Sequence, residues 1–143
     1  MPNQRADIRT QLLGYAFAWN SLERRLDSSL SAIRGISFAE YRILIALARS
    51  PNERASRVDL AESVGLTPSG VTRALQPLEK LRIIKTIKSE RDARLALASL
   101  TKAGRELVDD ASKVIDDLMT TLMARMSSRS SKLSDLLEDM QLR

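Results

Sequence analysis

The stretch LTPSGVTRALQPLEKL, residues 66–81, combines a helical apolar pattern with side chains that could make specific hydrogen bonds. Val71, Leu75 and Leu78 recur at three- and four-residue steps, which predicts a helix with a buried face. Polar residues occupy the opposite side: Ser69, Thr72, Arg73 and Gln76. An arginine can bind guanine, a glutamine adenine, and a threonine methyl group the methyl of thymine. This face therefore suits the edges of DNA bases, and a plain solvated helix face is the alternative.

The residues before this helix predict how it begins. Gly65 suits a left-handed turn position, and Leu66 is expected to anchor the turn in the core. Thr67 is the expected N-cap and Pro68 the first helical residue, where a missing N–H costs nothing. Gly70 would let the helix N-terminus approach a DNA phosphate, and close packing on the preceding helix explains it equally well. The expected DNA-contacting residues of the helix are Pro68, Ser69, Gly70, Thr72, Arg73 and Gln76.

Pro77 lies inside the same pattern, where a proline would cost about 3 kcal/mol by removing a hydrogen bond. The helix therefore either stops at Gln76 or continues with a kink. We favour the kink because Leu78 and Leu81 continue the apolar face. The residues that could contact bases then precede the bend.

The elements before this helix begin with capping signals. The segment SFAE (37–40) reads as a capping box that opens a helix, and SRVD (56–59) can cap a second, shorter one. After the helix, residues 83–88 and 95–100 are expected to be strands, joined by the charged loop SERDAR. Helix, short helix, tight turn, helix and two-stranded hairpin is the order of a winged helix-turn-helix.

The remainder of the chain predicts further helices. Thr101 can cap a long final helix that runs to Met126. A last short amphipathic helix is expected to carry Leu133, Leu136, Leu137 and Met140.

Positive charge is concentrated in the middle of the chain. The net charge is +5, yet residues 54–105 hold eleven Lys and Arg against five Asp and Glu, a balance of +6. The flanking segments together hold twelve basic and thirteen acidic residues, a balance of −1. A basic middle between neutral flanks is typical of a nucleic-acid footprint, and a solvated basic face is the other interpretation.

Cysteine and histidine are both absent from the 143 residues. Their absence removes disulfides, thiol redox sensing, Ser-His and Cys-His catalytic pairs and imidazole metal ligands. No Gly-rich or elbow-like setting presents a Ser/Lys or carboxylate pair, so we expect no enzyme, cofactor or metal site. There is no run of about 18 apolar residues, and the start MPNQRADIR lacks the apolar stretch of a secretory signal. A cytoplasmic protein without a membrane partner is expected.

The N-terminal segment carries a longer apolar stripe than a small domain needs for its own core. The stripe has a 4-3-4-3-4 spacing and consists of Ile8, Leu12, Tyr15, Trp19, Leu22 and Leu26. This pattern over nearly three heptads predicts either a seam with a partner helix or an ordinary buried helix. Together with the apolar face of the long final helix, it favours dimerisation.

The sequence resembles the MarR family of bacterial transcription regulators over essentially its whole length. RDARLALASLTKAG fits that family's wing pattern, with Asp92, Arg94, Leu100, Thr101 and Gly104 in the matching positions. DLAESVGLTPSGVTRALQPLEKL looks like the family's helix-turn-helix. Each piece alone is a weak signal, and their order between two long helices makes the resemblance strong.

The resemblance implies a mainly α-helical winged helix-turn-helix fold with a small two-stranded β wing. The expected division is an N-terminal dimerisation helix in residues 1–36, a DNA-binding domain in 37–101 and C-terminal dimerisation helices in 102–143. In a homodimer on a pseudo-palindromic duplex, residues 68–81 would enter a major groove. The wing would reach a flanking minor groove, with Asp92 bracing Arg94; its expected DNA-contacting residues are Lys88, Arg91, Asp92 and Arg94.

Two positions depart from the family's pattern. The family often has glycine where Arg82 stands, so the turn after the helix is expected to have a different shape. It often has a basic residue where Ala93 stands, so weaker minor-groove contacts are expected.

Many members of the family respond to small aromatic acids bound between the dimer helices and the DNA-binding lobe. Tyr15, Phe17 and Trp19 place three of the five aromatic residues close together, so Tyr15 and Trp19 are candidate pocket residues. Core and dimer packing is the favoured alternative for them. We expect a dimeric, sequence-specific DNA-binding repressor released by a ligand; a winged-helix module that binds proteins without base recognition is the alternative.

Overall fold

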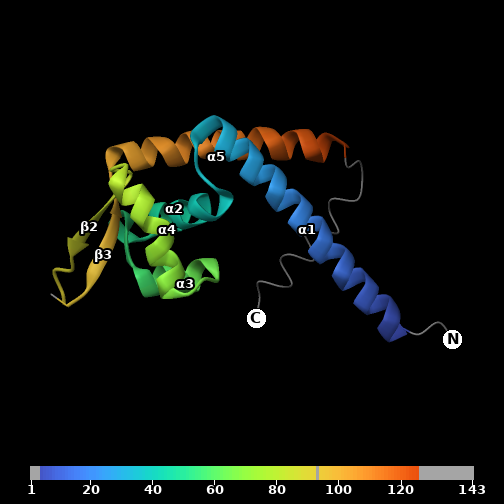
Figure 1. Ribbon diagram of the computed structural model, residues 1–143, viewed down its shortest axis with the longest axis horizontal. Coiled ribbons are helices and arrows are strands. Elements are labelled where there is room, and N and C mark those ends of the chain that lie inside the picture. Colours follow the sequence, from blue (N-terminus) through green and yellow to red (C-terminus); the bar gives the residue numbers. More distant parts are fainter. Residues whose placement is uncertain (1–3, 93, 126–143) are drawn as a thin grey trace.

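The computed structural model describes residues 4–92 and 94–125. Two long helices flank a smaller lobe (Figure 1). The helices are α1 (Gln4–Arg34), α2 (Phe38–Arg49), α3 (Arg57–Val64), α4 (Pro68–Lys80) and α5 (Lys102–Arg125). The C-terminal half of α1 packs against α5, while its N-terminal half extends away from the lobe (Figure 1). The predicted mainly helical winged helix-turn-helix is confirmed.

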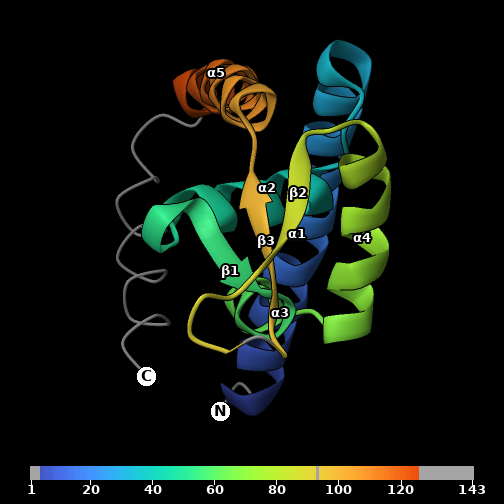
Figure 2. The same ribbon diagram turned by 90° about the vertical axis from the view of Figure 1, so that its left-hand side faces the viewer.

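Three short strands form one antiparallel sheet in the order β1-β3-β2. Their bounds are Arg54–Ser56 for β1, Ile84–Lys88 for β2 and Ala96–Leu100 for β3. Strands β2 and β3 are the predicted hairpin, which projects as the wing (Figure 2). Strand β1 is not among the predicted strands. It has three residues and follows a 3-10 turn (Pro51–Glu53), and three residues are too few to show an alternating pattern.

Side-chain caps begin the helices where the sequence predicts them. The Ser37 hydroxyl accepts the Glu40 N–H at 3.0 Å, and the Glu40 carboxylate accepts the Ser37 N–H at 2.7 Å, which completes the predicted capping box. The Ser56 hydroxyl accepts the Asp59 N–H at 3.1 Å and caps α3. Gly65 ends α3 with the expected left-handed conformation, at a φ of 68°.

The turn after α3 is not anchored as expected. Leu66 is 42% exposed, so its expected role as an apolar anchor in the core is wrong. The backbone closes the turn instead, because the Leu66 N–H donates to the Ala61 carbonyl at 2.9 Å. The left-handed Gly65 places that N–H within reach, and the leucine side chain can then remain at the surface.

Helix α4 continues through Pro77 and ends at Lys80, so it does not stop at Gln76. Leu78 is buried as expected, whereas Leu81 is 68% exposed. The expectation that Leu81 continues the apolar face is therefore wrong, because the helix has ended one residue earlier.

Arg82 adopts a left-handed conformation with a φ of 58°. The turn therefore keeps the geometry that a glycine favours, and the expectation of a different shape is wrong. The Arg82 N–H donates to the Glu79 carbonyl at 3.0 Å, and the Ile83 N–H donates to the Leu78 carbonyl at 2.9 Å. These two hydrogen bonds form a Schellman motif, in which a non-glycine residue carries the backbone strain.

Aliphatic side chains form the core. The largest fully buried ones are Leu30, Ile43, Leu44, Leu47, Leu60, Leu75, Leu78, Ile84 and Val71. Ala93, the expected helix end at Met126 and the expected helix with Leu133, Leu136, Leu137 and Met140 lie outside the described residues. Within the described ranges, no helix is long and apolar enough to span a bilayer, and no three metal-binding side chains are grouped to hold an ion.

Candidate nucleic-acid interface

The first turn of α4 is built by its cap. The Thr67 hydroxyl accepts the Gly70 N–H at 3.1 Å, and Pro68 follows as the first helical residue. Ser69 is exposed, and an N–H at the second helical position has no intrahelical acceptor, so a phosphate could approach it. A side chain on Gly70 would meet the Thr67 hydroxyl at 3.2 Å and Leu66 Cβ at 3.9 Å. Gly70 therefore packs against its own cap and turn, and not against α3.

Arg73 and Gln76 are exposed on the side of α4 opposite its buried face. Thr72 is half-buried and donates its hydroxyl to the Pro68 carbonyl at 2.9 Å, which leaves its methyl group for an apolar contact. Lys80 is exposed one turn beyond Gln76 on the same side, although it is not among the expected DNA-contacting residues. Its four-residue spacing from Gln76 is the signal that could have identified it.

The wing tip is held by local hydrogen bonds. The Ser89 N–H donates to the Leu95 carbonyl, and the Leu95 N–H donates to the Asp92 carbonyl, both at 2.9 Å. Asp92 Oδ1 accepts the backbone N–H of Arg94 at 2.9 Å, so Asp92 contacts the Arg94 backbone and not its guanidinium. These hydrogen bonds join the described residues of the loop, and the basic side chains stay exposed: Lys88, Arg91 and Arg94.

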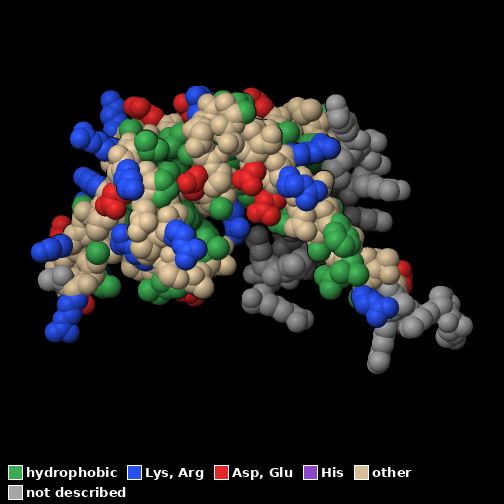
Figure 3. Space-filling view, in the orientation of Figure 1, with side chains coloured by type: hydrophobic (Ala, Val, Ile, Leu, Met, Phe, Trp, Pro, Cys, Tyr) green, Lys and Arg blue, Asp and Glu red, His purple; other side chains and the backbone are tan. Residues whose placement is uncertain are grey.

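Basic side chains project from the end of the lobe that carries the wing, on the left of Figure 3. Arg54, at the start of β1, lies 4.0 Å from the Glu90 carboxylate in the wing loop. The pair is exposed on both sides and therefore contributes little stability. Arg54 is a further cation beside the wing, and it is not among the expected DNA-contacting residues.

Thr86, in the middle of β2, is contacted from two helices. Glu79 Oε1 in α4 accepts the Thr86 N–H at 3.1 Å. Arg57 Nη2 in α3 lies 3.4 Å from the Thr86 hydroxyl. No spacing rule links these three residues, because the contacts join positions 7 and 29 residues apart and depend on how the hairpin folds back.

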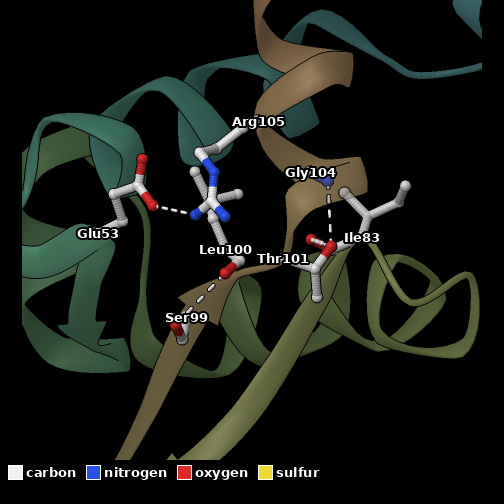
Figure 4. Close-up of polar contacts among 7 residues, drawn as sticks. All are labelled: Glu53, Ile83, Ser99, Leu100, Thr101, Gly104 and Arg105. Atoms are coloured by element: carbon white, nitrogen blue, oxygen red, sulfur yellow. Dashed lines mark hydrogen bonds and ion pairs between the residues drawn. The ribbon is translucent and has the colours of Figure 1, made fainter.

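Thr101 joins the turn that follows α4 to the start of α5 (Figure 4). Its hydroxyl lies 2.8 Å from the Arg82 carbonyl oxygen and 2.9 Å from that of Ile83, and it also accepts the Gly104 N–H at 3.1 Å. A side chain on Gly104 would lie 2.2 Å from the Ile83 carbonyl oxygen. Only glycine permits this approach, which explains the glycine at the end of the wing pattern RDARLALASLTKAG.

Two shallow hollows lie along α1. One of about 500 Å³ is lined by Asp27, Ser28, Ser31, Gly35, Ile36, Ser37 and Glu40. The other, of about 270 Å³, lies between α1 and α5 and is lined by Ser29, Ile33, Val114, Asp117, Leu118 and Thr121. Tyr15 and Trp19 line neither hollow and are 48% and 47% exposed. Their role in a ligand pocket stays a prediction.

The sequence profile described as MarR family matches residues 34–95, from the end of α1 through the wing loop. The predicted resemblance to the MarR family is confirmed over this segment. The match supports a DNA-binding transcriptional regulator.

Known transcriptional regulators match this chain over most of its length. The HTH-type transcriptional regulator YdgJ of Bacillus subtilis (strain 168) is 26% identical over 131 residues, which are 92% of this chain and 74% of YdgJ. Sco3205, a MarR family transcriptional regulator from Streptomyces coelicolor solved in complex with DNA, is 26% identical, with a TM-score of 0.82 over 95% of this chain and 86% of its own. BldR from Sulfolobus solfataricus, at 22% identity, shares the fold with a TM-score of 0.83 over 99% of both chains.

In this MarR-family fold the predicted site residues occupy three separate places. Those of the recognition helix share the exposed side and first turn of α4, and those of the wing lie at the end of β2 and in the hairpin loop. Tyr15 and Trp19 lie in α1, and the Trp19 ring lies 6.2 Å from the Phe38 ring at the start of α2.

Proposed function

We propose that this protein acts in the cytoplasm as a homodimeric repressor that binds a pseudo-palindromic operator and is released by a small aromatic ligand. The exposed face of α4 carries the proposal, because Arg73 and Gln76 are exposed there with hydrogen-bonding groups suited to purine edges. Arg91 and Arg94 at the wing tip would add contacts in flanking minor grooves.

The N-terminal half of α1 supports the homodimer. Its exposed apolar stripe lies on the helical face that is buried farther along at Leu26 and Leu30, and consists of Ile8, Leu12, Tyr15 and Trp19. Leu13 and Phe17 are exposed on the opposite side of the same helix. A helix that is apolar on two sides is normally buried, so we infer that a second copy covers it. Two-fold symmetry would then place two α4 helices about one DNA turn apart.

Aromatic rings at the junction of α1 with the lobe support the ligand. The ring centroids of Trp19 and Phe38 are 6.2 Å apart, and Phe38 stacks on Tyr41 at 6.2 Å with an interplanar angle of 19°. A flat aromatic ligand beside Trp19 would contact both α1 and the start of α2. Binding that favours one arrangement of these helices would change the spacing of the two α4 helices and weaken operator binding.

Trp19 is the single tryptophan of the chain, so its fluorescence reports directly on this junction. Benzoate and related aromatic acids are titrated into the protein, with and without bound operator. Quenching that saturates over the same concentrations that release DNA supports the ligand site. Release of DNA with no change at Trp19 would place the ligand elsewhere.

Operator binding is tested by fluorescence anisotropy with the DNA upstream of the gene and a scrambled duplex, across a salt series. We expect preference for the native duplex and a steep fall in affinity as salt rises, because phosphate contacts release counterions. If binding is equal and weak, and selection from random duplexes enriches none, a module that binds proteins without base recognition is the better description.

A further inference from the structure

Glu79 connects the two elements that are expected to contact DNA. It lies in the last turn of α4, and its Oε1 accepts the Thr86 N–H in the middle of β2 at 3.1 Å. The main-chain carbonyl of Glu79 accepts the Arg82 N–H and so helps to close the helix. The side chain and the backbone of one residue therefore both determine how β2 leaves α4.

Strand β2 depends on this contact because it lies at an edge. In the order β1-β3-β2, the outer side of β2 has no neighbouring strand among the described residues. The Thr86 N–H points to that side, since Glu79 and not β3 accepts it. An edge N–H would otherwise bond to water or to another chain. The Glu79 carboxylate supplies instead an acceptor carried by the recognition helix.

A small rotation at Thr86 becomes a large displacement at the wing tip. Arg91 is five residues farther along the chain, at most about 16 Å at the rise of a β-strand. A rotation of about 10° at Thr86 would then move Arg91 by roughly 3 Å, which is enough to break a hydrogen bond. The Arg57 guanidinium, at 3.4 Å from the Thr86 hydroxyl, steadies the same residue from α3.

We propose that Glu79 is a positioning residue that fixes the wing relative to α4, so that Arg91 and Arg94 reach flanking base pairs while Arg73 contacts the inner ones. The proposal rests on the operator binding proposed above and names the residue that couples its two contact regions. Glu79 acts through Thr86, because its own negative charge would repel DNA phosphates.

The test compares Glu79→Ala with Glu79→Gln in the full-length protein. Both substitutions remove the charge, but only glutamine keeps an oxygen that can accept the Thr86 N–H. The probe is a duplex that the wild-type protein enriches from a random library, prepared with and without the outer base pairs. The quantity compared is the factor by which the outer base pairs lower the Kd. We expect this factor to be about three- to tenfold smaller in Glu79→Ala than in wild type, and close to wild type in Glu79→Gln.

Hydrogen exchange of the Thr86 amide, measured by NMR on the free protein, gives a readout that requires no DNA. We expect exchange about tenfold faster in Glu79→Ala than in wild type and close to wild type in Glu79→Gln. The melting temperatures of the two variants control for a general loss of stability, which would accelerate exchange throughout the lobe.

Several outcomes would overturn the proposal. One is that Glu79→Ala gains as much affinity from the outer base pairs as wild type does, or that its Thr86 amide exchanges at the wild-type rate. Another is an equal loss in both variants, because the acceptor oxygen would then have no effect. Tight binding of the enriched duplex with no gain from outer base pairs also overturns it and leaves operator binding intact. Failure to enrich any duplex would instead overturn the proposed function.

Discussion

The winged-helix lobe and the N-terminal half of α1 contain similar apolar side chains in opposite environments. In the lobe, Leu44, Leu47 and Leu75 are completely or almost completely buried. In α1, every side chain from residue 7 to residue 20 is exposed, including Leu12 at 65%. The lobe completes its core with its own residues, whereas this half of α1 presents apolar surface on which the proposed second copy would pack. The comparison separates the region whose core one chain completes from the region that the proposed homodimer would complete.

The largest expected effect is that of Gly104→Ala in the lobe, and Gly14→Ala in α1 is the matched substitution. Gly104→Ala would place a Cβ 2.2 Å from the Ile83 carbonyl oxygen and 2.9 Å from Leu100 Cδ2. Because backbone must move, we expect the free energy of unfolding to fall by about 3 kcal/mol. Gly14→Ala in α1 meets no atom within 4 Å, and should raise that energy by about 0.5–1 kcal/mol.

Urea denaturation at one protein concentration measures both glycine variants. Equal stability of Gly104→Ala and wild type would mean that β2 can move away from α5 at little cost. A loss of stability in Gly14→Ala would mean that another chain packs closely against that glycine, which would sharpen the contrast between the regions.

A glutamate substituted for one exposed leucine in each region tests which leucine lies in the proposed dimer interface. Leu12→Glu should weaken the homodimer by about 2–3 kcal/mol, because a carboxylate would be buried in the apolar stripe. Leu81→Glu, at a leucine of similar exposure in the lobe, should leave self-association unchanged. Sedimentation equilibrium measures both, and wild-type dimerisation of Leu12→Glu would exclude this half of α1 from the interface.

Short-range signals in the sequence predict most of the lobe. The caps at Ser37, Thr67 and Thr101 depend on side chains within three residues of the amides that they bind, so a local pattern is sufficient. Leu66 and Leu81 show the limit of such patterns, because spacing indicates the direction of an apolar side chain and not the depth to which it is covered.

The residues that join elements could not be predicted in the same way. Gly104 fits the family's pattern, but its physical reason is the Ile83 carbonyl, which only the folded hairpin brings close. The contact of Glu79 with Thr86 likewise depends on the path of the chain after α4. For α1, the sequence predicts the stripe correctly and leaves open whether the same chain or a second one covers it.

Arginine substitutions test whether specific DNA contacts belong to the lobe alone. Arg73→Ala should weaken binding to the enriched duplex by roughly 1–3 kcal/mol and reduce its preference over a scrambled duplex, if the guanidinium contacts a base. Arg24→Ala, at an exposed arginine of α1, should change neither quantity. Anisotropy titrations measure both, and an unchanged preference in Arg73→Ala would exclude this arginine from base recognition.

The smallest expected effect is a gain of stability within the lobe itself. Arg82→Gly should raise the free energy of unfolding by about 0.5–1 kcal/mol, because a φ of 58° costs an arginine more than a glycine. Arg24→Gly, in the helical backbone of α1, should lower it by about 1 kcal/mol. Thermal and urea denaturation compare the two. If Arg82→Gly lowers stability, the arginine side chain must stabilise the lobe by more than its backbone strain costs, and the departure from the family's glycine would then be a favourable contact.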